Sequence, residues 1–353
     1  MGNWQIPPSG GHMERPSGVY YQTMNMTEIN VRLKQNDLII IPVCSTEFHG
    51  AGQPLGEDTF LVTRMAEQVA LKMGCTLAEP VWYGSHPFNH LGMPGTIVVP
   101  EEAFLANLRA IIAGLWNAGF RKQILLNGHG QEEVIPLALH QFAKKYQVPC
   151  ILISLHWPTA IHDYLKDKVH GGPFETQFQH ACEVEASYSL ALFPEFMQMN
   201  LAVDTKPEGF LPPGHVDKGG EVYHAPIRGH EHVGLGGTEL LVYPEGVIGR
   251  PTLANAEKAK AGLEALMDYL CRLIKDIMTR FPAGQLPPVD KVTQRDPKEI
   301  EALIKGPLNG GASVPSLTHR KLMAGKLPSR FGADSTVISM ARQASARGVG
   351  SWT

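Results

Sequence analysis

The clearest hydrophobic element of the chain is Leu38–Val43, an apolar and mostly β-branched run that is typical of a buried strand. Apolar runs at 123–126 and 150–154 predict two further buried strands. Apolar residues recur at the three- to four-residue spacing of amphipathic helices over 59–73, 101–118 and 254–278. Strands that alternate with helices in this way predict a parallel sheet covered by helices.

This alternation predicts one α/β catalytic domain over residues 28–281. Residues 1–27, which begin with a stretch rich in Gly and Pro, are expected to form an N-terminal arm. Prolines break the pattern from 282 onward, so 282–353 is expected to be a partly irregular C-terminal extension. Long loops in compact domains are usually functional, so the loop over 207–237 is predicted to be a lid or a substrate-binding segment. Its histidines are His215, His224, His230 and His232.

Composition narrows the class of protein. Of 353 residues, 43% are hydrophobic and 18% are charged, and the net charge is −3, which gives no sign of a nucleic-acid partner. The longest apolar runs are too short to span a membrane, so no membrane partner is expected. Five scattered cysteines without a Cys-x-x-Cys pair fit a reducing compartment and predict a cytoplasmic protein.

Residues that can bind a metal follow the first strand. Glu47 and His49 stand two positions apart, so in an extended backbone their side chains share one face. Asp58 comes just before the next helical stretch. Carboxylates combined with an imidazole suit Zn²⁺ or Mn²⁺. Asp58 could instead be the N-cap of its helix.

Two later clusters carry the same residue types. His129 lies in an Asn-Gly-His-Gly turn directly after the strand at 123–126, where the glycines let the imidazole approach a metal closely. His180, Glu183 and Glu185 stand together at the start of an apolar helix. The alternatives are a hydrogen-bonded histidine in a tight turn and acidic residues that favour a helix N-terminus. Because the carboxyl ends of parallel strands meet at one edge of the sheet, a common site is expected there.

With these clusters, the chain resembles the creatininase family of metal-dependent hydrolases over about residues 27–278. The matching segments, in the family's order, are Ser45-Thr46-Glu47-Phe48-His49-Gly50 with Pro54-Leu55-Gly56-Glu57-Asp58, His90 with Met93-Pro94-Gly95-Thr96, Asn127-Gly128-His129-Gly130, His180-Ala181-Cys182-Glu183-Val184-Glu185-Ala186-Ser187 and Pro244-Glu245-Gly246-Val247-Ile248-Gly249. The resemblance implies a three-layer α/β/α fold with a mostly parallel sheet. It also implies two divalent ions, Zn or Mn, at the carboxyl ends of the strands, and a homo-oligomer that is a hexamer in the family.

The resemblance further implies a set of metal ligands. Glu47, Asp58 and His129 would hold one ion. His49 and Asp58 would hold the other, so that Asp58 would bridge the two ions.

The chain departs from the creatinine-hydrolysing pattern at two positions. The glutamate that completes the second metal site in those enzymes is Gln131 here, and Glu185 is the expected substitute. The acid that precedes the catalytic histidine is Gln179 here, which removes a proton carrier. These changes are compatible with metal-dependent hydrolysis, but they make creatinine itself a doubtful substrate.

By the same resemblance, His180 is the candidate general acid/base, and Glu183 would orient it or the nucleophile. Trp157 would cover the substrate, although a core tryptophan is an equally good interpretation. The candidate substrate-binding residues are Trp157, His90 and Gln131.

The predicted reaction is attack of a metal-bound hydroxide on a carbonyl of a small, polar, cyclic substrate, with hydrolysis of a cyclic amide C–N bond. The first alternative is hydrolytic C–C ring opening of an oxidised inositol, such as a dehydro-inosose. The second is a non-catalytic, metal-binding assembly subunit. A nucleotide-dependent enzyme is disfavoured because no Gly-rich phosphate-binding motif follows a strand.

Overall fold

The computed structural model describes residues 18–131, 133–207, 212 and 239–314. Predictions for residues 1–17 of the arm and 315–353 of the extension therefore lie outside the described residues. The four histidines of the predicted 207–237 loop also lie outside them.

Within the described residues, four parallel strands form one sheet in the order β2-β1-β3-β4. The strands are β1 (Leu38–Val43), β2 (Thr76–Leu77), β3 (Lys122–Asn127) and β4 (Ile151–His156). The three predicted strands are confirmed, and β3 and β4 each extend beyond their apolar runs into polar residues. β2 has only two residues and is too short to produce a hydrophobic pattern.

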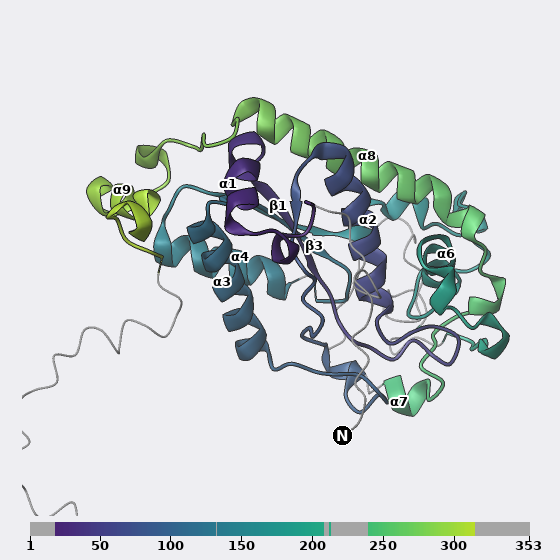
Figure 1. The fold of residues 1–353 in the computed structure, drawn as a ribbon. Helices are drawn as coiled ribbons and strands as arrows, with labels where there is room; N and C mark the ends of the chain where they lie inside the picture. Colours follow the sequence, from purple (N-terminus) through teal and green to yellow (C-terminus); the bar gives the residue numbers. More distant parts are fainter. Residues whose placement is uncertain (1–17, 132, 208–211, 213–238, 315–353) are drawn as a thin grey trace, which may run out of the picture. The chain divides into compact units, whose positions relative to one another are not determined.

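Helices cover both faces of the sheet, which confirms the three-layer α/β/α prediction (Figure 1). The described helices are α1 (Met26–Gln35), α2 (Glu57–Met73), α3 (Glu101–Ala118), α4 (Val134–Tyr146), α5 (Trp157–Ala160), α6 (Glu183–Leu192), α7 (Glu239–Val242), α8 (Ala256–Arg280) and α9 (Pro297–Lys305). None of the described side chains of α7 belongs to the two core layers. The C-cap of α3 is Gly119, which has a φ of 112°. Glycine adopts this backbone conformation readily because it has no Cβ.

The alternation of side chains along β1 divides the core into two layers. Leu38 and Ile40 pack with residues of α2, α6 and α8, whereas Ile39 and Ile41 pack on the opposite face with residues of α3 and α4. All six β1 residues are buried, because helices cover both faces of the strand, and the strand is therefore apolar throughout. Helix α8 carries one apolar stripe toward the first layer, as its sequence periodicity predicts.

The chain from 282 to 314 packs on the side of the sheet that α3 and α4 cover. Ile300 and Leu303 of α9 are buried in that core layer. Asn117 of α3 exchanges two hydrogen bonds of 2.9 Å with the backbone of Val314. The described residues belong to one compact unit, and the predicted domain boundary at 281 stays a prediction. None of the described helices is long and apolar enough to cross a membrane.

Candidate metal centre

Strand register brings the predicted clusters to one edge of the sheet. Val43 at the end of β1 pairs with Asn127 at the end of β3, which pairs in turn with His156 at the end of β4. The loop that carries Glu47 continues from β1, and the turn that carries His129 continues from β3. Parallel strands of equal register therefore place these two loops side by side.

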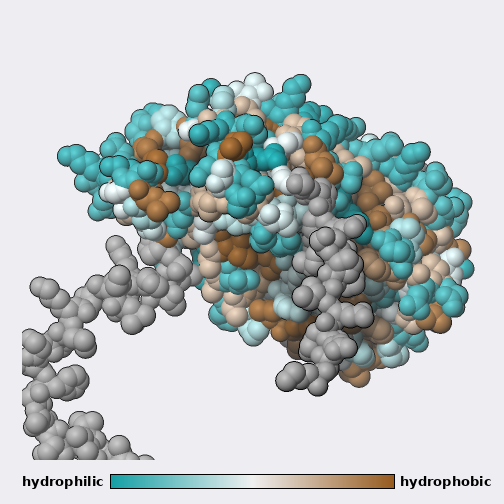
Figure 2. Space-filling model, viewed as in Figure 1, coloured by the Kyte–Doolittle hydropathy of each residue, from teal (hydrophilic) through white to brown (hydrophobic). Residues whose placement is uncertain are grey.

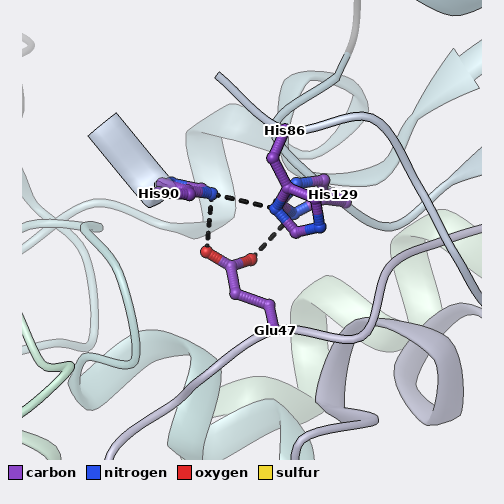
Figure 3. Close-up of side chains that lie close together, drawn as sticks. All are labelled: Glu47, His86, His90 and His129. Atoms are coloured by element: carbon purple, nitrogen blue, oxygen red, sulfur yellow. Dashed lines mark hydrogen bonds and ion pairs between the residues drawn. The ribbon is translucent and has the colours of Figure 1, made fainter. Parts of the chain in front are cut away.

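Glu47 lies at the centre of the site and is 1% exposed. Its Oε1 is 2.8 Å from Nδ1 of His90, and its Oε2 is 2.9 Å from Nδ1 of His129 (Figure 3). The same Nδ1 of His129 is 3.0 Å from Oδ2 of Asp58. Two buried carboxylates thus converge on one imidazole nitrogen. A cation bound by all three groups would compensate the buried negative charges.

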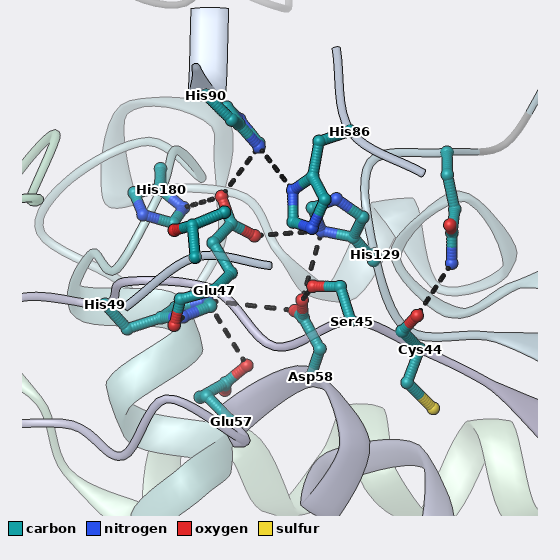
Figure 4. Close-up of polar contacts among 12 residues, drawn as sticks. Cys44, Ser45, Glu47, His49, Glu57, Asp58, His86, His90, His129 and His180 are labelled. Atoms are coloured by element: carbon teal, nitrogen blue, oxygen red, sulfur yellow. Dashed lines mark hydrogen bonds and ion pairs between the residues drawn. The ribbon is translucent and has the colours of Figure 1, made fainter. Parts of the chain in front are cut away.

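His49 lies on the other side of Asp58. Its Nδ1 is 3.1 Å from the backbone oxygen of Glu47, which leaves Nε2 directed at Asp58 Oδ1, 3.7 Å away (Figure 4). The two carboxylate oxygens of Asp58 therefore face different histidines, as those of a bridging ligand would. Ser45 donates a hydrogen bond of 2.6 Å to Asp58 and helps to fix its orientation.

The described residues contain three groups of side chains whose ligand atoms lie within 4.8 Å of one another. They are Glu47/His86/His90/His129, Glu47/His49/His180 and His49/Glu57/Asp58. The Nε2 atoms of His49, His86 and His129 are buried and have no hydrogen-bond partner among the described residues. Buried polar atoms normally have partners, so these orphaned nitrogens and the adjacent carboxylates fit a site for divalent cations.

The buried histidines and carboxylates of the site shift one another's pKa values. Burial opposes the charged form of His129, but Glu47 and Asp58 outweigh it and raise its pKa to about 10. His49 behaves in the same way, with Asp58 and Glu57 raising its pKa to about 9. Burial and the neighbouring His129 lower the pKa of His86 to about 3. The metal-free cluster therefore carries protons at neutral pH, and these protons must leave when a cation binds.

His180 reaches the same centre from the loop before α6. Its Nδ1 is 3.6 Å from Oε1 of Glu47, and its Nε2 is 2.8 Å from the backbone oxygen of Phe48. Ala181, the next residue, has a φ of 51°, a left-handed conformation that is strained for a residue with a Cβ. The carboxylate of Glu185 accepts a hydrogen bond from the backbone N–H of Ala181 and holds this turn. Burial raises the pKa of Glu185 to about 7.

Glu183 holds the segment that leads to His180. Its fully buried carboxylate accepts hydrogen bonds from the backbone N–H groups of Glu175 at 3.0 Å and Thr176 at 2.8 Å. The hydroxyl of Thr176 donates a third at 2.9 Å, and the ammonium group of Lys258 on α8 lies 2.5 Å away. These contacts fit the orienting role predicted for Glu183 rather than direct contact with a substrate.

Gln131 and Trp157 each have protein partners. The side-chain oxygen of Gln131 accepts a hydrogen bond from the backbone N–H of Ser85 at 3.0 Å, and its nitrogen donates to the oxygen of Cys44 at 3.2 Å. Trp157 packs in the core against Tyr188, with ring centroids 5.0 Å apart. The substrate-binding roles of Gln131 and Trp157 stay predictions.

Two residues of the site were not predicted from the sequence. Glu57 is adjacent to Asp58, and an acid at that position also suits the first turn of a helix. His86 lies four residues before His90 in a loop without a periodic pattern. The His-x-x-x-His spacing was the available signal, but only the fold shows that this loop lies over His129, with ring centroids 4.4 Å apart.

Gly128→Ala is expected to disturb the centre without removing any ligand. A Cβ at this position would lie 2.5 Å from the backbone oxygen of Asp58, so the start of α2 must shift. We expect lower metal retention and a loss of about 1–3 kcal/mol in the free energy of unfolding. Elemental analysis and thermal unfolding measure the two effects. Gly130→Ala is the matched control, because nothing lies within 4 Å of a Cβ there, and equal behaviour of the two variants would contradict the prediction.

The sequence of the chain is similar to those of known hydrolases. The family model described as creatinine amidohydrolase, named creatininase, matches residues 22–274. The 3-dehydro-scyllo-inosose hydrolase of Thermotoga maritima is 64% identical over 299 residues, which cover 85% of this chain and 96% of that protein. The creatinine amidohydrolase of Pseudomonas putida is 26% identical over 55% of this chain and 79% of its own length.

The fold is also that of solved structures. A structure titled "Creatininase Mn" superposes with a TM-score of 0.58 at 21% identity and covers 75% of this chain and 99% of its own. A putative creatinine amidohydrolase from Bacteroides fragilis gives a TM-score of 0.52 at 20% identity, covering 74% and 97%. At these identities the likeness establishes the fold alone.

Proposed function

The chain belongs to the creatininase family and is a metal-dependent hydrolase, and we propose that it opens the ring of an oxidised inositol by hydrolysing a C–C bond. The likeness to the Thermotoga hydrolase carries this proposal, because it spans nearly the whole of that protein. The creatinine amidohydrolase is far less similar. The proposal takes up the first alternative from the sequence.

We infer that the centre holds two divalent ions, Zn or Mn. Glu47, Asp58 and His129 would hold one, and His49 with Asp58 would contribute to the other. The converging carboxylates and the orphaned imidazole nitrogens support this assignment. When bound, such ions lower the pKa of water toward about 7 and polarise a carbonyl group.

Ring opening adds one water across a C–C bond. Hydroxide adds to one ketone carbon, the adjacent C–C bond breaks, and its electron pair moves to the carbon next to the second carbonyl. That carbon then takes a proton, so the product is an open-chain carboxylate. His180 is the proposed proton carrier: its Nε2 lies at the oxygen of Phe48, which leaves Nδ1 facing Glu47.

Hydrolysis of a cyclic amide is the second candidate. The match to the creatinine amidohydrolase family model favours it. The same attack on a carbonyl would break a C–N bond, and His180 would protonate the leaving nitrogen.

A substrate panel tests the choice. Metal-free protein reloaded with Zn²⁺ or Mn²⁺ is offered 3-dehydro-scyllo-inosose, creatinine and a simple formamide. We expect turnover of the dehydro-inosose that depends on added metal. Turnover of creatinine alone would establish the second candidate and contradict the first.

We also propose a cytoplasmic homo-oligomer. The face in Figure 2 mixes apolar and polar residues, and exposed apolar side chains include Phe88, Leu91, Ile97 and Leu241. The resemblance implies a hexamer, whose subunit contacts would cover part of this apolar surface. All five cysteines are unpaired, as in a reducing cytoplasm.

A further inference from the structure

Glu57, the first residue of α2, is a buried carboxylate beside the proposed centre. Its side chain is 1% exposed, and its Oε2 lies 3.6 Å from Nε2 of His49. Asp58, the next residue, places its Oδ1 3.7 Å from the same nitrogen. The first turn of α2 thus directs two consecutive carboxylates at one imidazole atom (Figure 4).

Nε2 of His49 is the atom that requires a partner. Nδ1 of this ring lies 3.1 Å from the backbone oxygen of Glu47, so when the ring is neutral, as a metal ligand must be, the favoured tautomer has an unprotonated Nε2. That Nε2 is buried and has no hydrogen bond. Contacts of 3.6 and 3.7 Å are too long for hydrogen bonds. Ligand atoms around a tetrahedral ion, each ~2.0–2.2 Å from it, lie roughly 3.3–3.6 Å apart. The two separations from His49 Nε2 are therefore close to those between ligands of one cation, and the ligand atoms of His49, Glu57 and Asp58 all lie within 4.8 Å of one another.

Other residues near this position are engaged elsewhere. Both ends of the Gln131 side chain are bonded to the protein, at Ser85 and Cys44. The carboxylate of Glu185 accepts the backbone N–H of Ala181, and among the described residues it belongs to none of the three groups of possible ligands. In the described part of the chain, the carboxylate of Glu57 accepts one hydrogen bond, of 2.5 Å from the hydroxyl of Ser189 to Oε1, and its Oε2 lies toward His49.

We propose that Glu57 is a ligand of the second cation, together with His49 and Asp58. This inference rests on the proposed function, because it assigns a ligand within the same binuclear centre. It makes α2 the source of both carboxylates of that site. It also replaces Glu185, the substitute expected from the sequence, by a residue whose oxygen lies with His49 and Asp58 in one group of possible ligands.

Counting bound ions tests the proposal without any activity assay. Metal-free wild type, Glu57→Gln and Ser189→Ala are titrated with Zn²⁺, desalted and analysed by elemental mass spectrometry. We expect two ions in the wild type and in Ser189→Ala, and one in Glu57→Gln. Ser189→Ala is the matched control, because it removes the other contact of Glu57 and keeps the carboxylate. Thermal unfolding of each metal-free protein verifies folding.

The outcomes separate this inference from the proposed function. Two ions in Glu57→Gln with wild-type affinity would overturn the assignment of Glu57 and leave the hydrolase intact. A wild type with one ion would also overturn it, whereas a wild type with none would overturn the proposed metal centre itself. If Glu57→Gln does not fold, a Zn²⁺-soaked wild-type crystal decides. An ion within about 2.5 Å of a Glu57 oxygen supports the proposal, and one beyond hydrogen-bond distance overturns it.

Discussion

Asp58→Asn is expected to abolish stable metal binding and to lower turnover by about 10³-fold or more, because metal activation is worth several kcal/mol of transition-state stabilisation. The carboxylate of Asp58 faces both His129 and His49, so its loss weakens both proposed ion sites at once. Asparagine keeps the shape of the side chain, so the fold is expected to persist. Elemental analysis and kinetics with saturating metal measure the effect.

Glu67→Gln is the matched control for Asp58→Asn. Glu67 lies on the same helix, and its carboxylate accepts a hydrogen bond of 2.7 Å from Tyr20 rather than facing the site. We expect the Glu67→Gln variant to have the metal content of the wild type. His129→Ala should behave like Asp58→Asn, and full metal content with normal turnover in either would refute the assigned centre.

Breaking the pair of Glu183 and Lys258 is expected to have the second-largest effect. Lys258→Met leaves a fully buried carboxylate without its cation, which costs about 3 kcal/mol in the free energy of unfolding. Glu183→Gln removes the charge that holds Glu175 and Thr176, so the segment before His180 loosens. For Glu183→Gln we expect kcat to fall about 10- to 100-fold.

The effects of Glu183→Gln on metal content, KM and kcat distinguish a role in positioning His180 from a purely structural role of Glu183. Metal content should stay at the wild-type value, and KM should change little, because the metal ligands remain in place. Lys260→Met, an exposed position on the same helix, is the control and should leave stability and kcat unchanged. A Glu183→Gln variant with normal kcat would show that this carboxylate does not act through His180.

The hydrophobic periodicity of the sequence was sufficient to predict the three layers of the fold, but not the detailed arrangement of the site. The six-residue run of β1 is covered on both faces, so its boundaries follow from its apolar residues alone. β3 and β4 end in polar residues, Asn127 and His156, which hydrophobicity cannot assign to a strand. Strand order and register then explain why Glu47 and His129 meet, since both follow strand ends that pair directly.

Side-chain direction within loops could not be predicted in the same way. Glu183 was predicted to orient His180 or the nucleophile, but its partners Thr176 and Lys258 come from a loop and a distant helix. His86 enters the site because its loop crosses over His129, a long-range placement without a local signal. Glu57 was not predicted as a site residue, because an acid in the first turn of a helix is already explained by its favourable interaction with the helix dipole.

The most direct test of the central claim is the product formed from 3-dehydro-scyllo-inosose in water labelled with a heavy oxygen isotope. Mass spectrometry should find an open-chain carboxylic acid that is one water heavier than the substrate, with at least one labelled oxygen in its carboxyl group. Its formation should stop when a chelator removes the metal and resume when Zn²⁺ or Mn²⁺ is restored. A product without added water, or no reaction by the metal-loaded protein, would contradict hydrolytic ring opening.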